Sequence, residues 1–205
     1  MHKNILIFLE KNLTENIKSE IEIRLNEFNL FKNKNNQEWF NELCFCLLTA
    51  NSKAETAIKI QIELSMDGFA KKTQTQIAYT IKKHGHRFHN TKASYIFLAR
   101  KFLNIKDILQ NLSDFQAREF LVTNIKGLGY KEASHFLRNV GYNNFAIIDR
   151  HVLRFLKHHN LISEIPKTIS KKNYLYFEEI LKNFNIAQSR LDLMIWAHMT
   201  GKVLK

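Results

Sequence analysis

The sequence predicts an all-α fold, and three observations support this. The chain of 205 residues contains six glycines and one proline, whereas an all-β domain needs many turns built from these two residues. Apolar side chains recur at the three- and four-residue spacing of amphipathic helices. Hydrophobic residues make up 45% of the chain and aromatic residues 12%, enough for a packed core. We therefore expect one good core or two small helical lobes.

The first predicted helix runs from Leu13 to Phe28, where apolar residues recur at helical spacing, with Asn12 as its N-cap. A second helix is expected over residues 39–50, and it meets the next helix at a tight turn around Asn51. Capping boxes, in which a Ser or Thr precedes Glu or Gln by three residues, mark further helix starts at 52–55, 73–76 and 113–116.

The remaining helices are placed by apolar periodicity and by glycines that end them. Two short helices are expected between residues 91 and 112, and single helices over 132–140, 150–159, 171–184 and 188–199. This gives about nine or ten helices in all.

Charge and cysteine content limit the class of protein. Lys and Arg number 31 against 19 Asp and Glu, a net charge of +12, which favours a polyanionic partner. Cys44 and Cys46 lie two residues apart in a helical pattern, so we expect reduced core thiols. A thiolate zinc or iron–sulfur site needs more cysteines.

No apolar run approaches the roughly 20 residues of a membrane span, so a soluble, cytoplasmic protein is expected.

A helix, a glycine corner and a second helix are predicted over residues 124–141. Gly127 and Gly129 allow a sharp turn that presents backbone N–H groups at the start of the second helix, and such groups bind anions. A DNA phosphate suits the charge of the chain. The alternative is ordinary packing, because glycine turns between helices are common.

Lys131 and Asp149 form a candidate catalytic pair. Lys131 lies at the start of the second helix, whose positive end favours the neutral amine, and Asp149 follows an apolar run 18 positions later. An amine nucleophile and a carboxylate that takes its proton can perform covalent catalysis. The alternatives are a solvated lysine and a helix N-cap, and each alone is the commoner role.

These motifs resemble the helix–hairpin–helix DNA glycosylase superfamily, in its bifunctional branch with a catalytic lysine. Trp196 and the ending Gly201-Lys-Val-Leu-Lys205 look like those of the type 2 8-oxoguanine DNA glycosylases, which end in lysine. The resemblance rests on Lys126-Gly-Leu-Gly-Tyr-Lys131, Ile148-Asp149-Arg-His151, Leu47-Leu-Thr-Ala-Asn51, Trp196 and Gly201-Lys-Val-Leu-Lys205.

The resemblance implies a single glycosylase unit over residues 1–205, with two helical lobes, the hairpin at about 115–141 and the active site in the cleft between the lobes. Lys131 would attack C1′ of the damaged nucleotide and form an imine, and β-elimination would then cut the strand. Asp149 would activate Lys131 or stabilise positive charge on the sugar.

The resemblance also implies contacts with DNA. Asn51 matches the Asn or Gln that enters the duplex where a base has been extruded. Gly127 and Gly129 would hold a backbone phosphate, and His151 matches a position that touches phosphate near the flipped nucleotide. For His151 an exposed helical histidine is the alternative.

Recognition of a flipped base needs an aromatic or apolar wall. Trp196 is the leading candidate and Phe88 a second, although both residue types are more often core. 8-Oxoguanine differs from guanine by an oxygen at C8 and a hydrogen at N7, and the terminal carboxylate of Lys205 is a candidate acceptor for the N7 hydrogen. A frayed chain end is the alternative.

No metal or cofactor is expected. His84, His86 and His89 do not fall on one helical face, and no Asp, Glu or Cys completes a ligand set. The expected partner is double-stranded DNA containing oxidised guanine, bound by a monomer. Two alternatives are the same chemistry on another oxidised base and a non-catalytic DNA-binding module. A helical scaffold unrelated to nucleic acid would leave the charge unexplained.

Overall fold

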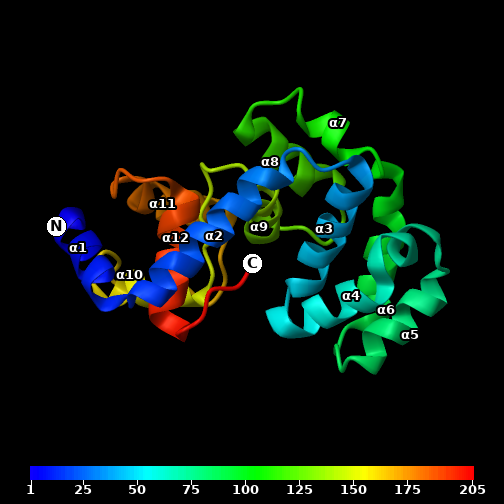
Figure 1. The fold of residues 1–205 in the computed structure, drawn as a ribbon, viewed down its shortest axis with the longest axis horizontal. Helices are drawn as coiled ribbons and strands as arrows, with labels where there is room; N and C mark the ends of the chain where they lie inside the picture. Colours follow the sequence, from blue (N-terminus) through cyan, green and yellow to red (C-terminus); the bar gives the residue numbers. More distant parts are fainter. The chain divides into compact units, whose positions relative to one another are not determined.

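The chain folds into twelve α-helices and one short 3₁₀ helix, with no strand (Figure 1). The computed structural model describes residues 1–205. The predicted all-α class is confirmed, and none of the helices has the length and apolarity needed to cross a membrane. The helices are α1 His2–Asn12, α2 Glu15–Phe31, α3 Asn36–Thr49, α4 Ala54–Lys71, α5 Gln74–Lys83, α6 His89–Ala99, α7 Ile105–Leu109, α8 Asp114–Asn124, α9 Tyr130–Asn139, α10 Arg150–His158, α11 Lys171–Lys182 and α12 Gln188–Thr200, with the 3₁₀ helix at Arg100–Phe102.

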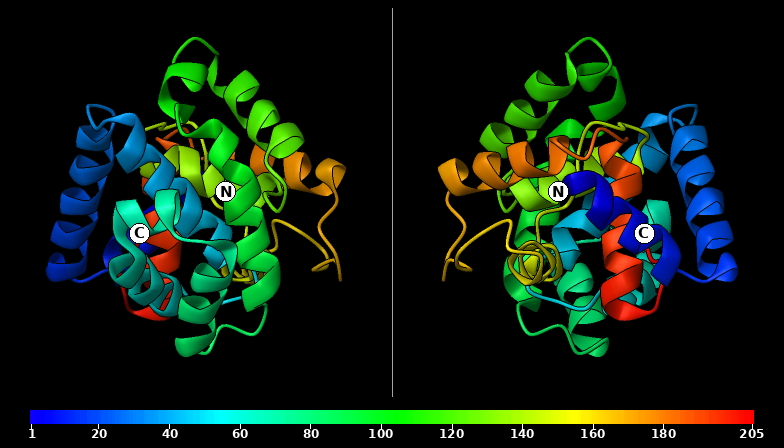
Figure 2. Two further views of the ribbon diagram at one scale, coloured as in Figure 1. Left: turned by 90° about the vertical axis from the view of Figure 1, so that its right-hand side faces the viewer. Right: turned by 90° about the vertical axis from the view of Figure 1, so that its left-hand side faces the viewer.

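The helices form two compact units, and each has its own core. Residues Asn33–Phe136 form the central unit, while Met1–Lys32 and Leu137–Lys205 together form the terminal unit. Both chain ends therefore belong to the terminal unit (Figure 2). The second boundary falls inside α9, so this helix continues from one unit into the other.

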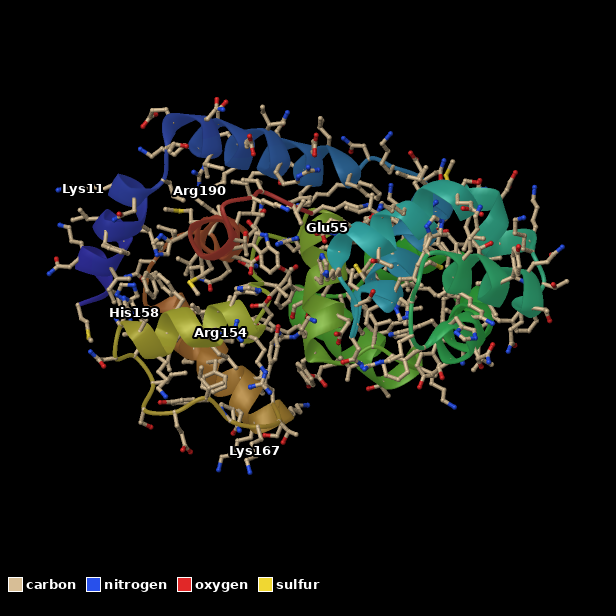
Figure 3. All side chains as sticks on the ribbon, turned by 90° about the horizontal axis from the view of Figure 1, so that it is seen from below. Lys11, Glu55, Arg154, His158, Lys167 and Arg190 are labelled. Atoms are coloured by element: carbon tan, nitrogen blue, oxygen red, sulfur yellow. The ribbon has the colours of Figure 1, made fainter.

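In the terminal unit, α12 packs against α1, α2, α10 and α11. Figure 2 shows α1 and α12 side by side, and Figure 3 shows Arg190 of α12 close to α2, where it binds Glu22. Leu191 and Ile195 of α12 are fully buried. The helix ends at Gly201, which adopts a left-handed conformation (φ +71°), as predicted.

In the central unit, α3 is the core helix. Nearly every residue from Trp39 to Thr49 is buried, including the polar residues Glu42 and Thr49. Helices α4, α6 and α7 pack around α3, and α5 packs on α4 and α6. Cys44 and Cys46 are fully buried and neither is in a disulfide, as predicted for core thiols. Burial raises the pKa of the Cys44 thiol well above its usual value.

Two of the three predicted capping boxes are confirmed. Thr73 Oγ1 accepts a hydrogen bond from the Gln76 N–H at 3.2 Å, and the Gln76 side chain accepts one from the Thr73 N–H at 2.9 Å. Residues 113–116 repeat this arrangement at the start of α8. The predicted box at 52–55 is wrong, because α4 begins at Ala54 without a side-chain cap. Residue 52 belongs instead to a turn in which its N–H binds the carbonyl of residue 49 at 3.2 Å.

The N-terminal prediction also needs correction. Residues 2–12 form α1, which was not predicted, and this raises the number of helices above the expected nine or ten. Asn12 is not an N-cap, because its side-chain amide donates to the carbonyl of Phe8 in its own helix at 2.8 Å. Thr14 caps α2 instead, accepting a hydrogen bond from the Ile17 N–H at 3.3 Å.

Candidate active site

The predicted hairpin is present in the central unit, and a buried arginine holds it together. Helices α8 and α9 are joined by a corner at residues 125–129. Arg118 of α8 is buried, donates to Ser134 Oγ of α9 at 3.3 Å, and lies 5.2 Å from the centre of the Tyr130 ring. The Tyr130 hydroxyl in turn donates to the carboxylate of Glu119 in α8. These contacts fix the two helices and the corner between them.

Gly127 is the position in the corner where no other residue fits. Its φ is +95°, and a Cβ atom there would lie 2.2 Å from the ring of Tyr95 in α6. The Nζ of Lys126 lies 6.0 Å from the centre of the same ring. The corner therefore packs closely on Tyr95, and a side chain at position 127 would force it away.

Lys131 lies at the start of α9, as predicted, although the helix begins at Tyr130 and not at residue 132; its side chain is about one-third exposed. Its Nζ lies 3.4 Å from Oε1 of Glu132. The other oxygen of Glu132 accepts a hydrogen bond from the Gly129 N–H at 3.3 Å. One carboxylate thus links the candidate nucleophile to the glycine corner. It also occupies an N–H group that the sequence interpretation assigned to a phosphate.

Lys92 is a functional candidate that the sequence analysis missed. This residue of α6 is only 4% exposed, and its Nζ donates to the carbonyl of Leu47 at 2.6 Å. Burial lowers the pKa of Lys92 to about 8; the charge of Glu132 opposes this shift and the charge of Lys131 adds to it. The three charged groups therefore lie within electrostatic range of one another. The signal was present in the sequence, because Lys92 shares the helical spacing of the buried residues Ile96 and Ala99.

Asn51 lies in a strained turn after α3. It is exposed and adopts a left-handed conformation (φ +62°), which asparagine tolerates better than most residues. The turn is closed by the 3.2 Å hydrogen bond from the Ser52 N–H to the carbonyl of Thr49. The side chain is thus presented at the end of the core helix of the central unit. We refer to residues 49–52 as the Asn51 turn.

Phe88 immediately precedes α6 in the central unit and is 37% exposed. The Arg87 guanidinium lies 4.6 Å from the centre of its ring. The neighbouring histidines do not converge: His84 Nε2 lies 2.7 Å from Glu63, whereas His86 is buried and binds the carbonyl of Leu48 at 3.0 Å. No group of three or more His, Cys, Asp or Glu side chains is arranged to hold a metal ion.

In the terminal unit, Asp149 is the N-cap of α10. Its Oδ1 accepts hydrogen bonds from the N–H groups of His151 at 2.8 Å and Val152 at 2.9 Å. The capping role that the sequence left as an alternative is therefore real. It does not exclude catalysis, because both bonds go to Oδ1 and leave Oδ2 available to accept a proton or face a positive charge.

A buried scaffold holds the irregular segment that leads to Asp149. The Ile147 N–H donates to Asp192 Oδ1 at 2.9 Å, and the carboxylate of Asp192 is paired with Arg138. The Tyr174 hydroxyl donates to the carbonyl of Ala146 at 3.2 Å. Burial raises the pKa of Asp192 to about 6, although Arg138 and the Ile147 N–H oppose the shift.

His151 and Trp196 contact each other in the terminal unit. Their ring centres are 4.8 Å apart at an interplanar angle of 70°, and His151 is half-buried. The alternative interpretation of His151 as an exposed helical histidine is therefore wrong. The Trp196 Nε1 is buried and has no hydrogen-bond partner in the chain. Lys205 is half-buried at the end of the irregular segment that follows Gly201.

The predicted site residues are thus divided between the two units. Each unit holds one member of the proposed catalytic pair together with candidate DNA contacts. The central unit holds Lys131, Gly127, Gly129, Asn51 and Phe88, and the terminal unit holds Asp149, His151, Trp196 and Lys205.

Comparison with known proteins places the chain in a family. A family model described as 8-oxoguanine DNA glycosylase matches residues 21–189. The protein named 8-oxoguanine DNA glycosylase/AP lyase from Methanocaldococcus jannaschii is 54% identical over 202 residues, covering 96% of this chain and 97% of the relative. The protein of the same name from Thermotoga maritima is 44% identical over 200 residues, covering 95% and 96%.

Solved structures agree with the sequence comparison. The crystal structure of the Methanocaldococcus jannaschii 8-oxoguanine glycosylase/lyase, in complex with a 15mer DNA containing 8-oxoguanine, superposes with a TM-score of 0.93 at 53% identity, covering 98% of this chain and all of the other. The Thermotoga maritima 8-oxoguanine DNA glycosylase gives a TM-score of 0.91 at 42% identity and covers both chains fully. The resemblance inferred from the motifs is confirmed, and the chain belongs to the 8-oxoguanine DNA glycosylase family.

Proposed function

We propose that this protein is a bifunctional DNA glycosylase and abasic-site lyase that removes 8-oxoguanine from DNA. The observation that carries the proposal is the position of Lys131, directly after the Gly127–Gly129 corner, in a chain 54% identical to a relative named for both activities. An amine at a helix start beside a turn that approaches DNA closely is placed to react with the sugar.

The chemistry assigned to Lys131 proceeds through a covalent intermediate. Its neutral Nζ attacks C1′, the glycosidic bond breaks, and the base leaves with the bonding electron pair and takes up a proton. Opening of the sugar ring and loss of a proton from nitrogen give an imine between Nζ and C1′. Loss of a proton from C2′ then breaks the bond between C3′ and its oxygen, which cuts the strand. Hydrolysis of the imine frees the lysine.

Asp149 supports this reaction electrostatically. Its Oδ2 would accept the proton of the attacking amine or stabilise the positive charge that develops on the sugar, while Oδ1 remains bound to the helix start. The pairing of Lys131 with Glu132 holds the lysine in the free protein, and this ion pair must open before the amine can attack.

The DNA contacts follow from charge and from turn geometry. The net charge of +12 favours the phosphate backbone, and we assign phosphate contacts to the Gly127 and Gly129 corner and to His151. Asn51 is assigned to the gap left in the duplex by the extruded base. The proposed partner is double-stranded DNA containing oxidised guanine, bound by one copy of the chain. The proposed site of action is the cytoplasm, at the nucleoid if the source is a prokaryote.

Recognition of the lesion is assigned to three residues. Trp196 and Phe88 would provide walls for the extruded base, and the carboxylate of Lys205 would accept a hydrogen bond from N7–H, which guanine lacks. A C-terminal extension beyond Lys205 should therefore weaken the preference for 8-oxoguanine over guanine while cleavage of abasic sites persists. An unchanged preference would remove Lys205 from the site.

The test of the function is covalent trapping. Borohydride reduces an imine, so the protein should become linked to duplex DNA that carries 8-oxoguanine or an abasic site, and the product should be visible on a denaturing gel. The link should disappear in Lys131→Gln and persist in Lys101→Gln, a control that removes a surface lysine of the same unit. Abasic-strand cleavage by Lys131→Gln at the native rate would show that the nucleophile is another group.

A panel of duplexes with single lesions tests the substrate. Excision of 8-oxoguanine should exceed excision of oxidised pyrimidines. Binding of all duplexes without trapping would instead indicate a non-catalytic module, which would show a steep dependence on salt.

A further inference from the structure

The C-terminal end of α3 is completed by donors from distant parts of the chain. A helix leaves its last four carbonyls without partners inside the helix. Here the carbonyls of residues 46–49 are all bound. In order, the donors are the hydroxyl of Thr49 at 2.8 Å, the ammonium of Lys92 at 2.6 Å, the imidazole of His86 at 3.0 Å and the N–H of Ser52 at 3.2 Å. Two of the four thus come from residues 38 and 45 positions away in sequence.

The hydrogen bonds of His86 fix its protonation state. Its Nδ1 accepts a hydrogen bond from the Phe88 N–H at 3.1 Å, so Nε2 must carry the proton that is donated to the carbonyl of Leu48. Burial lowers the pKa of His86, which is consistent with the neutral ring. Its bond to Leu48 is therefore a directional contact of a neutral side chain.

The ammonium of Lys92 is retained at a cost. It is 4% exposed, and removal from water is the main reason that its pKa falls to about 8. A methionine has a similar length and would fill the same space without this cost, because an apolar side chain loses nothing on burial. What the ammonium supplies and a methionine cannot is a donor to the buried carbonyl of Leu47.

These donors bind the carbonyls that directly precede Asn51. We propose that Lys92 and His86 are positioning residues for Asn51: by holding the last carbonyls of α3, they keep Asn51 in the left-handed conformation from which it enters the duplex. The proposal rests on the proposed role of Asn51. No glycine ends α3 and no side chain caps α4, so the local sequence alone does not hold this turn.

The test is a double-mutant cycle on two substrates. Excision of 8-oxoguanine is measured under single-turnover conditions in a duplex and in the same strand alone, for the wild type, Lys92→Met, Asn51→Ala and the double variant. Asn51→Ala should lower the duplex-to-single-strand rate ratio by about tenfold, since gap filling is needed in the duplex only. Lys92→Met should lower the ratio several-fold, and the double variant should lower it no further than Asn51→Ala.

Two variants make the cycle interpretable. Lys101→Met removes a lysine of the neighbouring 3₁₀ helix that contacts the Phe102 ring and should leave the ratio unchanged. His86→Phe keeps an aromatic ring but removes the donor to Leu48, so it should lower the ratio as Lys92→Met does. It also serves as the test if Lys92→Met does not fold.

Several results would overturn the proposal. It fails if the ratio is unchanged in Lys92→Met and His86→Phe, or if the losses multiply in the double variant. It also fails if Asn51→Ala leaves the ratio intact. Borohydride trapping of the wild type on a single-stranded abasic oligonucleotide separates this failure from failure of the proposed function, because a single strand has no gap for Asn51 to fill: trapping there tests the lysine chemistry, whereas the rate ratio tests Asn51. Loss of trapping in Lys92→Met would show that Lys92 acts on Lys131 and not through Asn51.

Discussion

Both units bury a charge to hold the backbone beside a candidate catalytic or DNA-binding residue, but they do so differently. In the central unit the Lys92 ammonium binds a neutral carbonyl, and in the terminal unit the Asp192 carboxylate is paired with Arg138. Lys92 supports the Asn51 turn, and Asp192 supports the segment before Asp149.

The two buried charges differ in the partners that compensate them. Asp192 has an opposite full charge and a backbone donor, yet burial still raises its pKa to about 6. Lys92 has a carbonyl and a more distant carboxylate, and its pKa falls to about 8 while Lys131 repels it. We therefore expect the terminal unit to depend on its ion pair for stability, whereas the buried charge of the central unit is compensated mainly by one hydrogen bond to a carbonyl.

The largest expected effect is on the pair in the terminal unit. Arg138→Met leaves the Asp192 carboxylate buried without its partner, which should lower the free energy of unfolding by about 3–5 kcal/mol at pH 8. The loss should be smaller at pH 5. The folded-state pKa of Asp192 already lies above its unfolded value, and removal of Arg138 raises it further, so the folded protein takes up a proton as the pH falls and the penalty diminishes.

Urea denaturation at both pH values measures this effect. The double variant Arg138→Met/Asp192→Leu serves as the control and should recover most of the loss, since it removes both charges. An equal loss at pH 5 and pH 8 would mean that the carboxylate is not the source of the penalty.

The next effect separates the structural role of Asp149 as a helix cap from its proposed catalytic role. Asn accepts the same two N–H bonds, so Asp149→Asn should change stability by less than about 0.5 kcal/mol. It loses the negative charge, so the rate of the chemical step should fall on the order of 10²–10³-fold while DNA binding is retained. Single-turnover excision and gel-shift titration measure the two quantities. A loss of DNA affinity as large as the loss of rate would show that Asp149 acts in DNA binding and not in the chemical step.

A smaller effect concerns the stability cost of Lys92. Its pKa is about 8 in the folded protein and about 10.5 when unfolded, so between these values the unfolded chain binds more protons and wild-type stability rises with pH. Between pH 7.5 and pH 10.5, the free energy of unfolding of the wild type should rise by about 3 kcal/mol relative to that of Lys92→Met. Each pKa unit of difference between the folded and unfolded states corresponds to about 1.36 kcal/mol. Urea denaturation of both proteins across this range measures the difference. Parallel curves would show that Lys92 is not desolvated.

The smallest effect compares local helix caps, one in each unit. Thr14→Ala and Thr73→Ala should each lower the free energy of unfolding by about 1 kcal/mol, because each side chain binds the N–H three residues later. Asn12→Ala should have a smaller effect, since Asn12 bonds only within α1. Thermal denaturation measures the stability of all three variants. A larger loss of stability in Asn12→Ala than in Thr14→Ala would show that Asn12, and not Thr14, caps α2.

Much of the fold could be predicted because its signals are local. The boxes at 73–76 and 113–116, the glycine at 201 and the burial of Cys44 and Cys46 all follow from spacing along one helix. The Lys131 and Asp149 motifs were also visible, since a nucleophile at a helix start and a carboxylate at another are placed by a few neighbouring residues.

Other features depended on which of several competing local hydrogen bonds forms. Asn12 and the 52–55 box were misassigned because competing hydrogen bonds, to Phe8 and to the carbonyl of Thr49, decided the local geometry. The bond from the Gly129 N–H to Glu132 was also within reach of the sequence, because Glu132 lies three residues after the residue that precedes α9, the spacing of a capping-box glutamate.

The sequence by itself determined the helical class, the basic charge and the hairpin with its lysine, because helix periodicity and turn chemistry act over a few residues. Only the tertiary structure decided that Lys92 and His86 complete α3 and that Arg138 and Asp192 hold the segment before Asp149. The reason is that a buried polar group must find a partner wherever the fold brings one, and sequence spacing carries no record of that distance.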